Sequence, residues 1–158
     1  MSINRERPHV FVLPEDDANR QVALGFGLYA ATGQLQVLRV AKGWRKVVEA
    51  FNASHASGMR RLPLQHMVLL VDFDGDENRR TQVRQNIPSD LAARVYILGC
   101  LKEPEDLRRS LGSYETIGQS LAQDCRHDTN STWNHALLIH NAGELDRLRT
   151  RVRPILFP

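Results

Sequence analysis

Four short apolar runs, each followed by a segment with the apolar spacing of a helix, constrain the fold of this chain most strongly. The runs are HVFVL, QLQVLRV, HMVLLVDF and RVYILGC, at residues 9–13, 34–40, 66–73 and 94–100. The inner runs are almost continuously apolar, as is typical of strands buried on both faces. We therefore predict an α/β fold with a mostly parallel four-stranded central sheet and helices on both faces.

The segments between and after these runs predict helices. Asp17 is a good N-cap residue for the first of them, and Pro154 is expected to close the last. The helices are expected at residues 17–31, 45–55, 104–112, 114–125 and 135–152, with a short helix or loop at 76–87.

Length and composition fit one globular domain. The chain has 158 residues, 42% hydrophobic and 25% charged, which suffices for a proper core. We expect a single domain over residues 1–158, with residues 113–158 as a C-terminal helical extension packed on it. No stretch approaches the ~18 apolar residues of a membrane span, and the start lacks the apolar segment of a signal peptide, so the predicted location is cytoplasmic, without a membrane partner. The spacing of Cys100 and Cys125 indicates neither a disulfide framework nor a zinc site.

Acidic residues follow three of the four apolar runs. They are Glu15, Asp16 and Asp17, then Asp72, Asp74 and Asp76, and then Glu103, Glu105 and Asp106. In an open parallel sheet, ligands gather at the carboxyl ends of the strands. Like charges placed there repel one another, and a divalent cation offsets that cost. Magnesium prefers carboxylate oxygens and needs only one or two per ion, so the pattern predicts a Mg²⁺ or Mn²⁺ site suited to in-line displacement at phosphorus.

The stretches FVLPEDD (11–17) and LLVDFDGD (69–76) resemble the Toprim domain, in which a glutamate follows the first strand and a DxD motif follows a later one. That domain is shared by topoisomerases, primases, repair proteins and the overcoming-lysogenization-defect nucleases. The resemblance covers roughly residues 8–110, and the segment VLRVAKGWRKVVEAF between the motifs is similar to compact stand-alone members of the group. It implies a Toprim- or Rossmann-like fold and a magnesium-dependent site for phosphodiester bonds.

The resemblance also implies roles for individual residues. Glu15 matches the family glutamate and is the expected catalytic residue, while Asp72 and Asp74 match the metal-binding DxD. In the nuclease branch another acidic residue after the next strand joins the metals, and Glu103 and Glu105 both remain candidates. The family glutamate is often followed by glycine, whereas here Asp16 follows and is an alternative metal ligand.

The expected partner is nucleic acid, DNA or RNA, which the net charge of +3 permits without requiring it. Lys42, Arg79 and Arg80 are the predicted contacts to its backbone. A nuclease in defence or repair fits the nuclease branch by analogy. No ATPase module accompanies the site, so such a partner would be a separate chain. The apolar ending RPILFP is expected to dock on the domain or on a second copy in a homodimer.

Structural interpretations stand beside these functional ones. Glu15, Glu103 and Glu105 also suit the first turns of helices, and Asp76 suits a turn. Two other functions remain open: a receiver-like signalling domain, and a Toprim-like module without activity that serves in binding or assembly. The receiver reading expects Ser or Thr after the fourth strand, where ILGCLKEPED has none.

Overall fold

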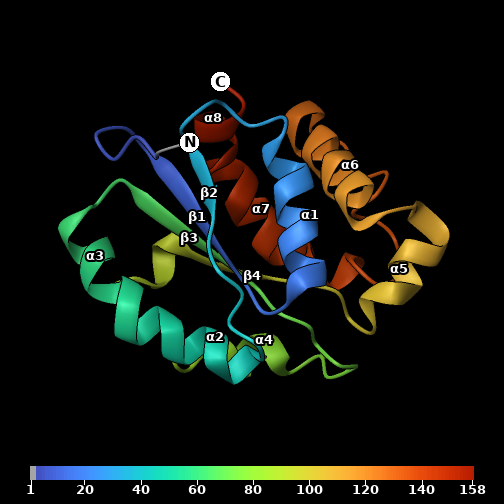
Figure 1. The fold of residues 1–158 in the computed structure, drawn as a ribbon, viewed down its shortest axis with the longest axis horizontal. Helices are drawn as coiled ribbons and strands as arrows, with labels where there is room; N and C mark the ends of the chain where they lie inside the picture. Colours follow the sequence, from blue (N-terminus) through green and yellow to red (C-terminus); the bar gives the residue numbers. More distant parts are fainter. Residues whose placement is uncertain (1–2) are drawn as a thin grey trace.

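The computed structural model describes residues 3–158 and contains one four-stranded sheet in which every pair of neighbouring strands is parallel (Figure 1). The strand order is β2-β1-β3-β4, so β1 and β3 are central and β2 and β4 form the edges. The predicted α/β fold is confirmed. The strands are β1 (His9–Pro14), β2 (Leu35–Val37), β3 (Gln65–Leu70) and β4 (Val95–Leu98).

Helical elements account for most of the remaining chain. None of those in residues 3–158 is long and apolar enough to cross a membrane. They are α1 (Asp17–Gly27), α2 (Trp44–Ala50), the π-helix η1 (Phe51–His55), α3 (Ala56–Arg61), α4 (Arg79–Arg84), the 3-10 helix η2 (Ala92–Arg94), α5 (Pro104–Leu111), α6 (Tyr114–His127), the 3-10 helix η3 (Ile139–Asn141), α7 (Ala142–Arg151) and α8 (Arg153–Leu156).

The apolar side chains of the sheet form two cores, one on each face. Val10 and Val12 of β1 face a core built with α1, α5, α6, α7 and α8. Phe11 and Leu13 face the other core, built with α2, η1, α3 and α4. This alternation follows from the period-two geometry of a strand. Figure 1 shows the two helical layers on opposite sides of the sheet, which confirms the prediction of helices on both faces.

The C-terminal helices build a large part of one of these cores. Leu121 of α6, Leu148 of α7 and Leu156 of α8 are each at most 5% exposed and pack against the sheet. Helices α1 and α6 cross so closely that Gly25 and Gly118 leave no room for side chains. Residues 113–158 therefore complete one layer of the fold.

Several predicted elements differ in extent; the helices expected at 17–31 and 135–152, for example, are observed as α1 (Asp17–Gly27) and α7 (Ala142–Arg151). The strand expected at 34–40 pairs with β1 only over Leu35–Val37, although two hydrogen bonds, from Leu38 N–H to the Val12 carbonyl and from Ala41 N–H to the Pro14 carbonyl, prolong the contact. The helix expected at 45–55 extends from residue 44 to residue 61 through the π-helix. Pro154 lies in the first turn of α8, where its missing N–H costs nothing, so it starts a helix instead of ending one.

Asn141 forms hydrogen bonds with the backbone directly after the edge strand β4. Its side chain is fully buried; Nδ2 donates to the carbonyls of Gly99 (2.9 Å) and Leu138 (2.9 Å), and Oδ1 accepts from the Gly99 N–H (3.2 Å). We predict that Asn141→Ala lowers the free energy of unfolding by about 2–4 kcal/mol, because it removes the hydrogen-bond partner of the buried Gly99 N–H and carbonyl. Urea unfolding of both proteins measures the difference, and a change below about 0.5 kcal/mol would contradict this role.

Candidate functional site

The carboxyl ends of β1 and β3 bring Glu15 and Asp72 into direct contact. The two strands pair in register from His9 with Gln65 to Pro14 with Leu70, so the residues that follow them are neighbours. Glu15 Oε2 accepts a hydrogen bond from the Asp72 N–H at 2.5 Å, and the Glu15 N–H donates to the Leu70 carbonyl at 2.8 Å. Both side chains are buried, with Glu15 9% and Asp72 8% exposed. The structure thus brings together Glu15 and Asp72, two of the predicted site residues.

Asp16 joins this pair from the start of α1. It is the N-cap of the helix, because its Oδ1 accepts from the Asn19 N–H at 2.9 Å. Asp17, the predicted N-cap, instead lies in the first turn, so that prediction was wrong by one residue. Asn19 Nδ2 donates to Asp16 Oδ1 (3.0 Å) and to Asp72 Oδ1 (3.1 Å), and it therefore bridges the two carboxyl groups.

The crowding of carboxyl groups changes their acidity. Burial raises the pKa of Asp72 to about 8, and the hydrogen bond and negative charge of Asp16 reinforce that effect. The pKa of Glu15 is also raised, first by burial and then by Asp16 and Asp74. With its pKa near 8, the Asp72 carboxyl group is mostly protonated at neutral pH.

Asp74 lies at the next turn and faces Arg79. Arg79 Nη1 donates to Asp74 Oδ2 at 3.1 Å and to the Asp72 carbonyl at 2.9 Å, while Nε donates to Gln82 Oε1 at 3.1 Å. The guanidinium lies over the ring of Trp44, 4.7 Å from its centre, in a cation–π contact. Arg79, a predicted nucleic-acid contact, is therefore held beside the acidic cluster by groups from three segments.

The turn after β3 explains the spacing of its aspartates. Asp74 and Gly75 adopt positive φ angles of 52° and 77°, a backbone region that aspartate tolerates and glycine favours. Asp76 N–H donates to the Phe73 carbonyl at 2.9 Å, and Asp76 Oδ1 accepts from the Asn78 N–H at 2.9 Å. Asp76 thus has the turn role expected for it.

The remaining acidic candidates lie around the start of α5. Glu103 is the N-terminal flanking residue of that helix and Glu105 is in its first turn, and both are exposed. Glu103 and Asp72 both act on the buried Cys100 thiol, whose pKa is raised to about 11 chiefly by burial. Burial raises the pKa of Tyr114, and the charges of Glu105 and Asp72 add to that effect. Glu103 and Glu105 therefore each act electrostatically on a side chain that Asp72 also affects. Both remain candidates for the additional metal ligand.

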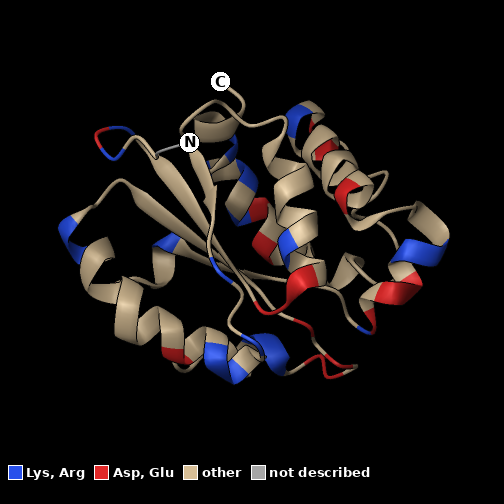
Figure 2. Cartoon of the chain, in the orientation of Figure 1, with Lys and Arg blue, Asp and Glu red and all other residues tan. Residues whose placement is uncertain are grey.

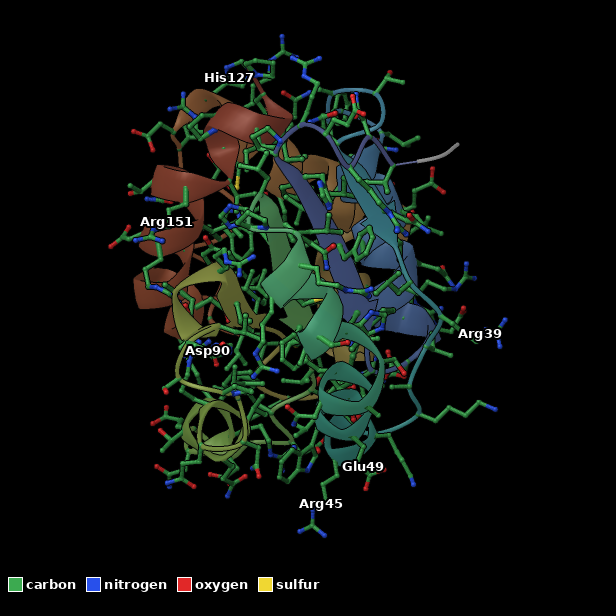
Figure 3. The ribbon with its side chains drawn as sticks, turned by 90° about the vertical axis from the view of Figure 1, so that its left-hand side faces the viewer. Arg39, Arg45, Glu49, Asp90, His127 and Arg151 are labelled. Carbon is green, nitrogen blue, oxygen red and sulfur yellow. The ribbon has the colours of Figure 1, made fainter. Side chains whose placement is uncertain are left out.

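The two other predicted basic contacts occupy different surroundings. Lys42 is exposed, and its N–H donates to the Glu15 carbonyl at 2.7 Å, so it lies next to the cluster. Arg80 instead donates to the Ile97 carbonyl (3.0 Å), the His140 carbonyl (3.0 Å) and Asn141 Oδ1 (2.7 Å) at the β4 edge. Figure 2 shows acidic segments at one end of the sheet beside basic positions at the starts of α2 and α4. Arg39 and Arg45 project away from the ribbon (Figure 3).

Sequence reasoning did not identify Asn19 or the contact of Trp44 with Arg79. The spacing from Asp16 to Asn19, which is that of an N-cap and its N3 residue, was the available signal for the first. Nothing in the sequence signals the second, because Trp44 and Arg79 belong to helices that meet only in the fold.

The chemistry of the cluster fits a hard divalent cation. Its donors are carboxylate oxygens from Glu15, Asp16, Asp72 and Asp74, the ligand type that Mg²⁺ and Mn²⁺ prefer. In residues 3–158, however, no group of three or more His, Cys, Asp or Glu side chains is placed so that it could hold a metal ion. Comparisons of the chain with models of known families, with curated proteins and with solved structures gave no match.

Proposed function

We propose that this protein is a Toprim-like, magnesium- or manganese-dependent protein that binds or cleaves phosphodiester bonds of nucleic acid. The observation that carries the proposal is the meeting of acidic side chains from two adjacent parallel strands, with Glu15 bonded to the Asp72 backbone and Asp16 beside the Asp72 carboxyl group. A cation bound there neutralises charges that otherwise repel one another in a buried position. This is also the end of an open parallel sheet at which ligands bind.

Asp72 and Asp74 would hold the metal, together with Asp16 and with Glu103 or Glu105. When bound, the ion supplies positive charge to the phosphate that undergoes displacement. The hydrogen bonds from Asn19 orient the Asp16 and Asp72 carboxyl groups before any ligand arrives. Such preorganisation reduces the cost of assembling a charged site.

Glu15 is proposed as the proton carrier or as an additional ligand. The pKa of Glu15 is raised, so it is closer to neutral pH than the pKa of an exposed glutamate. Such a pKa suits general acid–base chemistry. Its hydrogen bond to the Asp72 N–H also fixes the position at which Asp72 leaves the strand.

Arg79 is proposed to bind the phosphate. Within residues 3–158, Arg79 donates its side-chain hydrogen bonds from Nε and Nη1. The hydrogens on Nη2 are therefore available to an anionic ligand. The Trp44 ring and the Asp72 carbonyl hold the guanidinium in place, so little side-chain entropy is lost on binding.

Cleavage of a supercoiled plasmid and of single-stranded DNA and RNA in Mg²⁺ or Mn²⁺ tests the proposal. We expect nicking by the wild-type protein and a loss of about a hundredfold or more in Asp72→Asn/Asp74→Asn. An Asp90→Asn variant, altered at a remote exposed carboxylate paired with Arg60, is the control and should retain activity. Metal-dependent binding of nucleic acid without cleavage would identify an inactive Toprim-like binding module. The absence of both binding and cleavage would contradict the proposal.

The receiver-like alternative shares the acidic residues after β1 and β3 but needs further groups. A hydroxyl residue would follow β4, where the chain has Gly99 and Cys100. A lysine would follow a fifth strand, and in residues 3–158 β4 is an edge strand. The phosphodiester proposal therefore accounts for more of the site.

A further inference from the structure

A groove of about 640 Å³ lies along the β4 edge, between α4 and α7. Its charged lining comes from Arg80 and Arg84 of α4 and from Glu144 and Arg147 of α7. Small residues complete it, so its walls are low and the arginines are accessible from solvent. The small residues are Ala92, Ala93 and Gly143.

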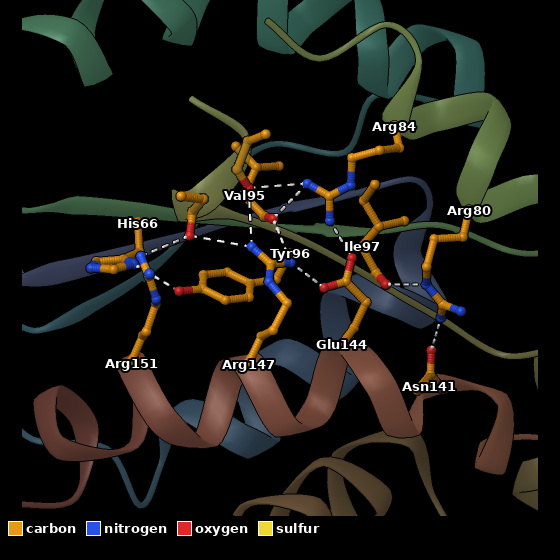
Figure 4. A network of polar contacts seen from close by, with 12 residues as sticks. His66, Arg80, Arg84, Val95, Tyr96, Ile97, Asn141, Glu144, Arg147 and Arg151 are labelled. Atoms are coloured by element: carbon orange, nitrogen blue, oxygen red, sulfur yellow. Dashed lines mark hydrogen bonds and ion pairs between the residues drawn. The ribbon is translucent and has the colours of Figure 1, made fainter. Parts of the chain in front are cut away.

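The backbone of the edge strand holds these arginines in place, as Figure 4 shows. Arg80 Nε donates to the Ile97 carbonyl at 3.0 Å, and Arg84 Nη1 donates to the Val95 carbonyl at 3.0 Å. Arg147 Nη2 donates to the Ala92 carbonyl at 3.0 Å. Carbonyl groups carry no net charge, so they fix the guanidinium groups without neutralising them.

One carboxylate balances the positive charge only in part. Glu144 is 6% exposed and forms ion pairs with both Arg84 and Arg147. Three guanidinium groups therefore share one carboxylate in the groove, which leaves two positive charges in excess. Burial and the neighbouring Arg84 lower the pKa of Arg80, as expected for a cation whose charge is not fully compensated.

Donor groups remain for a ligand. The bonds of Arg80 leave one hydrogen on Nη1 and one on Nη2, and those of Arg84 leave Nε and one hydrogen on Nη2. His140 lines the same groove, and neither of its buried ring nitrogens has a hydrogen-bond partner in residues 3–158. Burial and Arg80 lower the His140 pKa to about 4, so the ring is neutral and adds no charge to the groove.

We infer that this groove is a phosphate-binding site, in which Arg80, Arg84 and Arg147 receive the phosphate group of a nucleic-acid backbone. Planar, fixed guanidinium groups suit the oxygens of a phosphate. Phe73 connects the groove to the acidic cluster: it lies between Asp72 and Asp74 in the chain, and its ring contacts His140 (4.5 Å between ring centres) and Arg80 (4.9 Å). The choice of a phosphodiester over free phosphate rests on the proposed function, whereas the binding of a phosphate group does not.

Gly143 permits a test that leaves the arginines intact. A Cβ atom added there meets nothing within 4 Å, so Gly143→Glu places a carboxylate in the groove without a clash, and Gly143→Gln adds the same bulk without charge. Gly58→Glu is the matched control, because Gly58 lies on α3 outside the groove and also has open space around its Cβ position. Equal unfolding midpoints or higher ones in the variants show that the fold is kept.

Binding of a fluorescent oligothymidylate is measured in EDTA by anisotropy, and binding of inorganic phosphate is measured directly by isothermal titration. We expect about a tenfold or greater loss of affinity in Gly143→Glu, with changes below about threefold in Gly143→Gln and Gly58→Glu. Phosphate binding that Gly143→Glu abolishes, without oligonucleotide binding, assigns the site to free phosphate. Equal binding by wild type and Gly143→Glu, or no binding of either probe, overturns the inference. Because EDTA removes divalent cations, this binding does not depend on the proposed metal site, and a failure of the metal proposal is therefore distinguishable from a failure of this inference.

Discussion

Asp72→Asn should raise the free energy of unfolding by about 2 kcal/mol near neutral pH in the absence of divalent cations. The wild-type carboxyl group is buried beside Asp16, and its pKa is raised to about 8. At neutral pH, folding therefore requires Asp72 either to take up a proton or to bury a negative charge, and each alternative lowers the free energy of unfolding. The asparagine amide keeps the acceptor for the Asn19 hydrogen bond and adds a donor that can face Asp16.

The pH dependence gives the sign of this effect. The unfolded Asp72 has a pKa near its ordinary value of 3.8, so between that pH and about 8 the folded wild-type protein holds a proton that the unfolded chain has lost. Wild-type stability therefore falls across this range, and the advantage of Asp72→Asn grows until it levels off above about pH 8. The opposite trend holds for Asp90, because the hydrogen bond from Arg60 lowers its pKa. Asp90→Asn should therefore be less stable than wild type at neutral pH and equally stable in acid. Urea unfolding in EDTA from about pH 2.5 to pH 9 measures both, and an advantage of Asp72→Asn that shrinks as pH rises would contradict the assignment.

Gly118→Ala should destabilise the fold by about 3 kcal/mol or more, because it separates two helices whose backbones touch. A Cβ atom at residue 118 would lie 2.0 Å from the Val22 carbonyl oxygen and 2.7 Å from the Phe26 nitrogen. These are backbone atoms of α1, so a change of rotamer cannot relieve the clash. Helix α1 also carries Asp16 at its N-cap, and its displacement should weaken metal binding as well.

Gly143→Ala is the matched control for this prediction. It also lies within a helix, α7, but its Cβ position has no neighbour within 4 Å. Alanine there should be neutral or should stabilise by about 0.5–1 kcal/mol through its higher helix propensity. Thermal unfolding of the two variants separates packing from propensity. Similar unfolding temperatures for both would show that the α1–α6 crossing tolerates a methyl group.

The sheet could be predicted from the sequence because its strands are buried on both faces. Continuous apolar runs such as VYIL (95–98) have no other place in a chain of this size, and the helical segments between the runs require parallel connections. The ends of the elements were predicted less well. Phe51 lies inside a π-helix that links α2 to α3, and the hydrophobic spacing of a helix does not reveal such an insertion.

The candidate site was predictable where strand order alone determined it. Glu15 and Asp72 follow neighbouring strands, so their meeting needed only the parallel sheet. The partners of Arg79 and Arg80 depended on which way adjacent side chains of α4 point: Arg79 turns to Asp74, and Arg80 turns to the β4 edge. Adjacent helical positions lie about 100° apart around the axis, and a sequence cannot say which of them faces the cluster before the neighbouring elements are placed.

Isothermal titration of Mn²⁺ and Mg²⁺ into wild-type protein and Asp72→Asn at pH 7.5 distinguishes a metal site from carboxylates that have only a structural role. We predict saturable binding to wild type with release of protons, because the cation displaces the proton held by Asp72, whose pKa is about 8. We also predict a loss of affinity of about a hundredfold in Asp72→Asn and none in Asp90→Asn, measured under the same conditions. Equal affinity in wild type and Asp72→Asn, or no binding to either, would contradict the assignment of these strand-end carboxylates to a metal site.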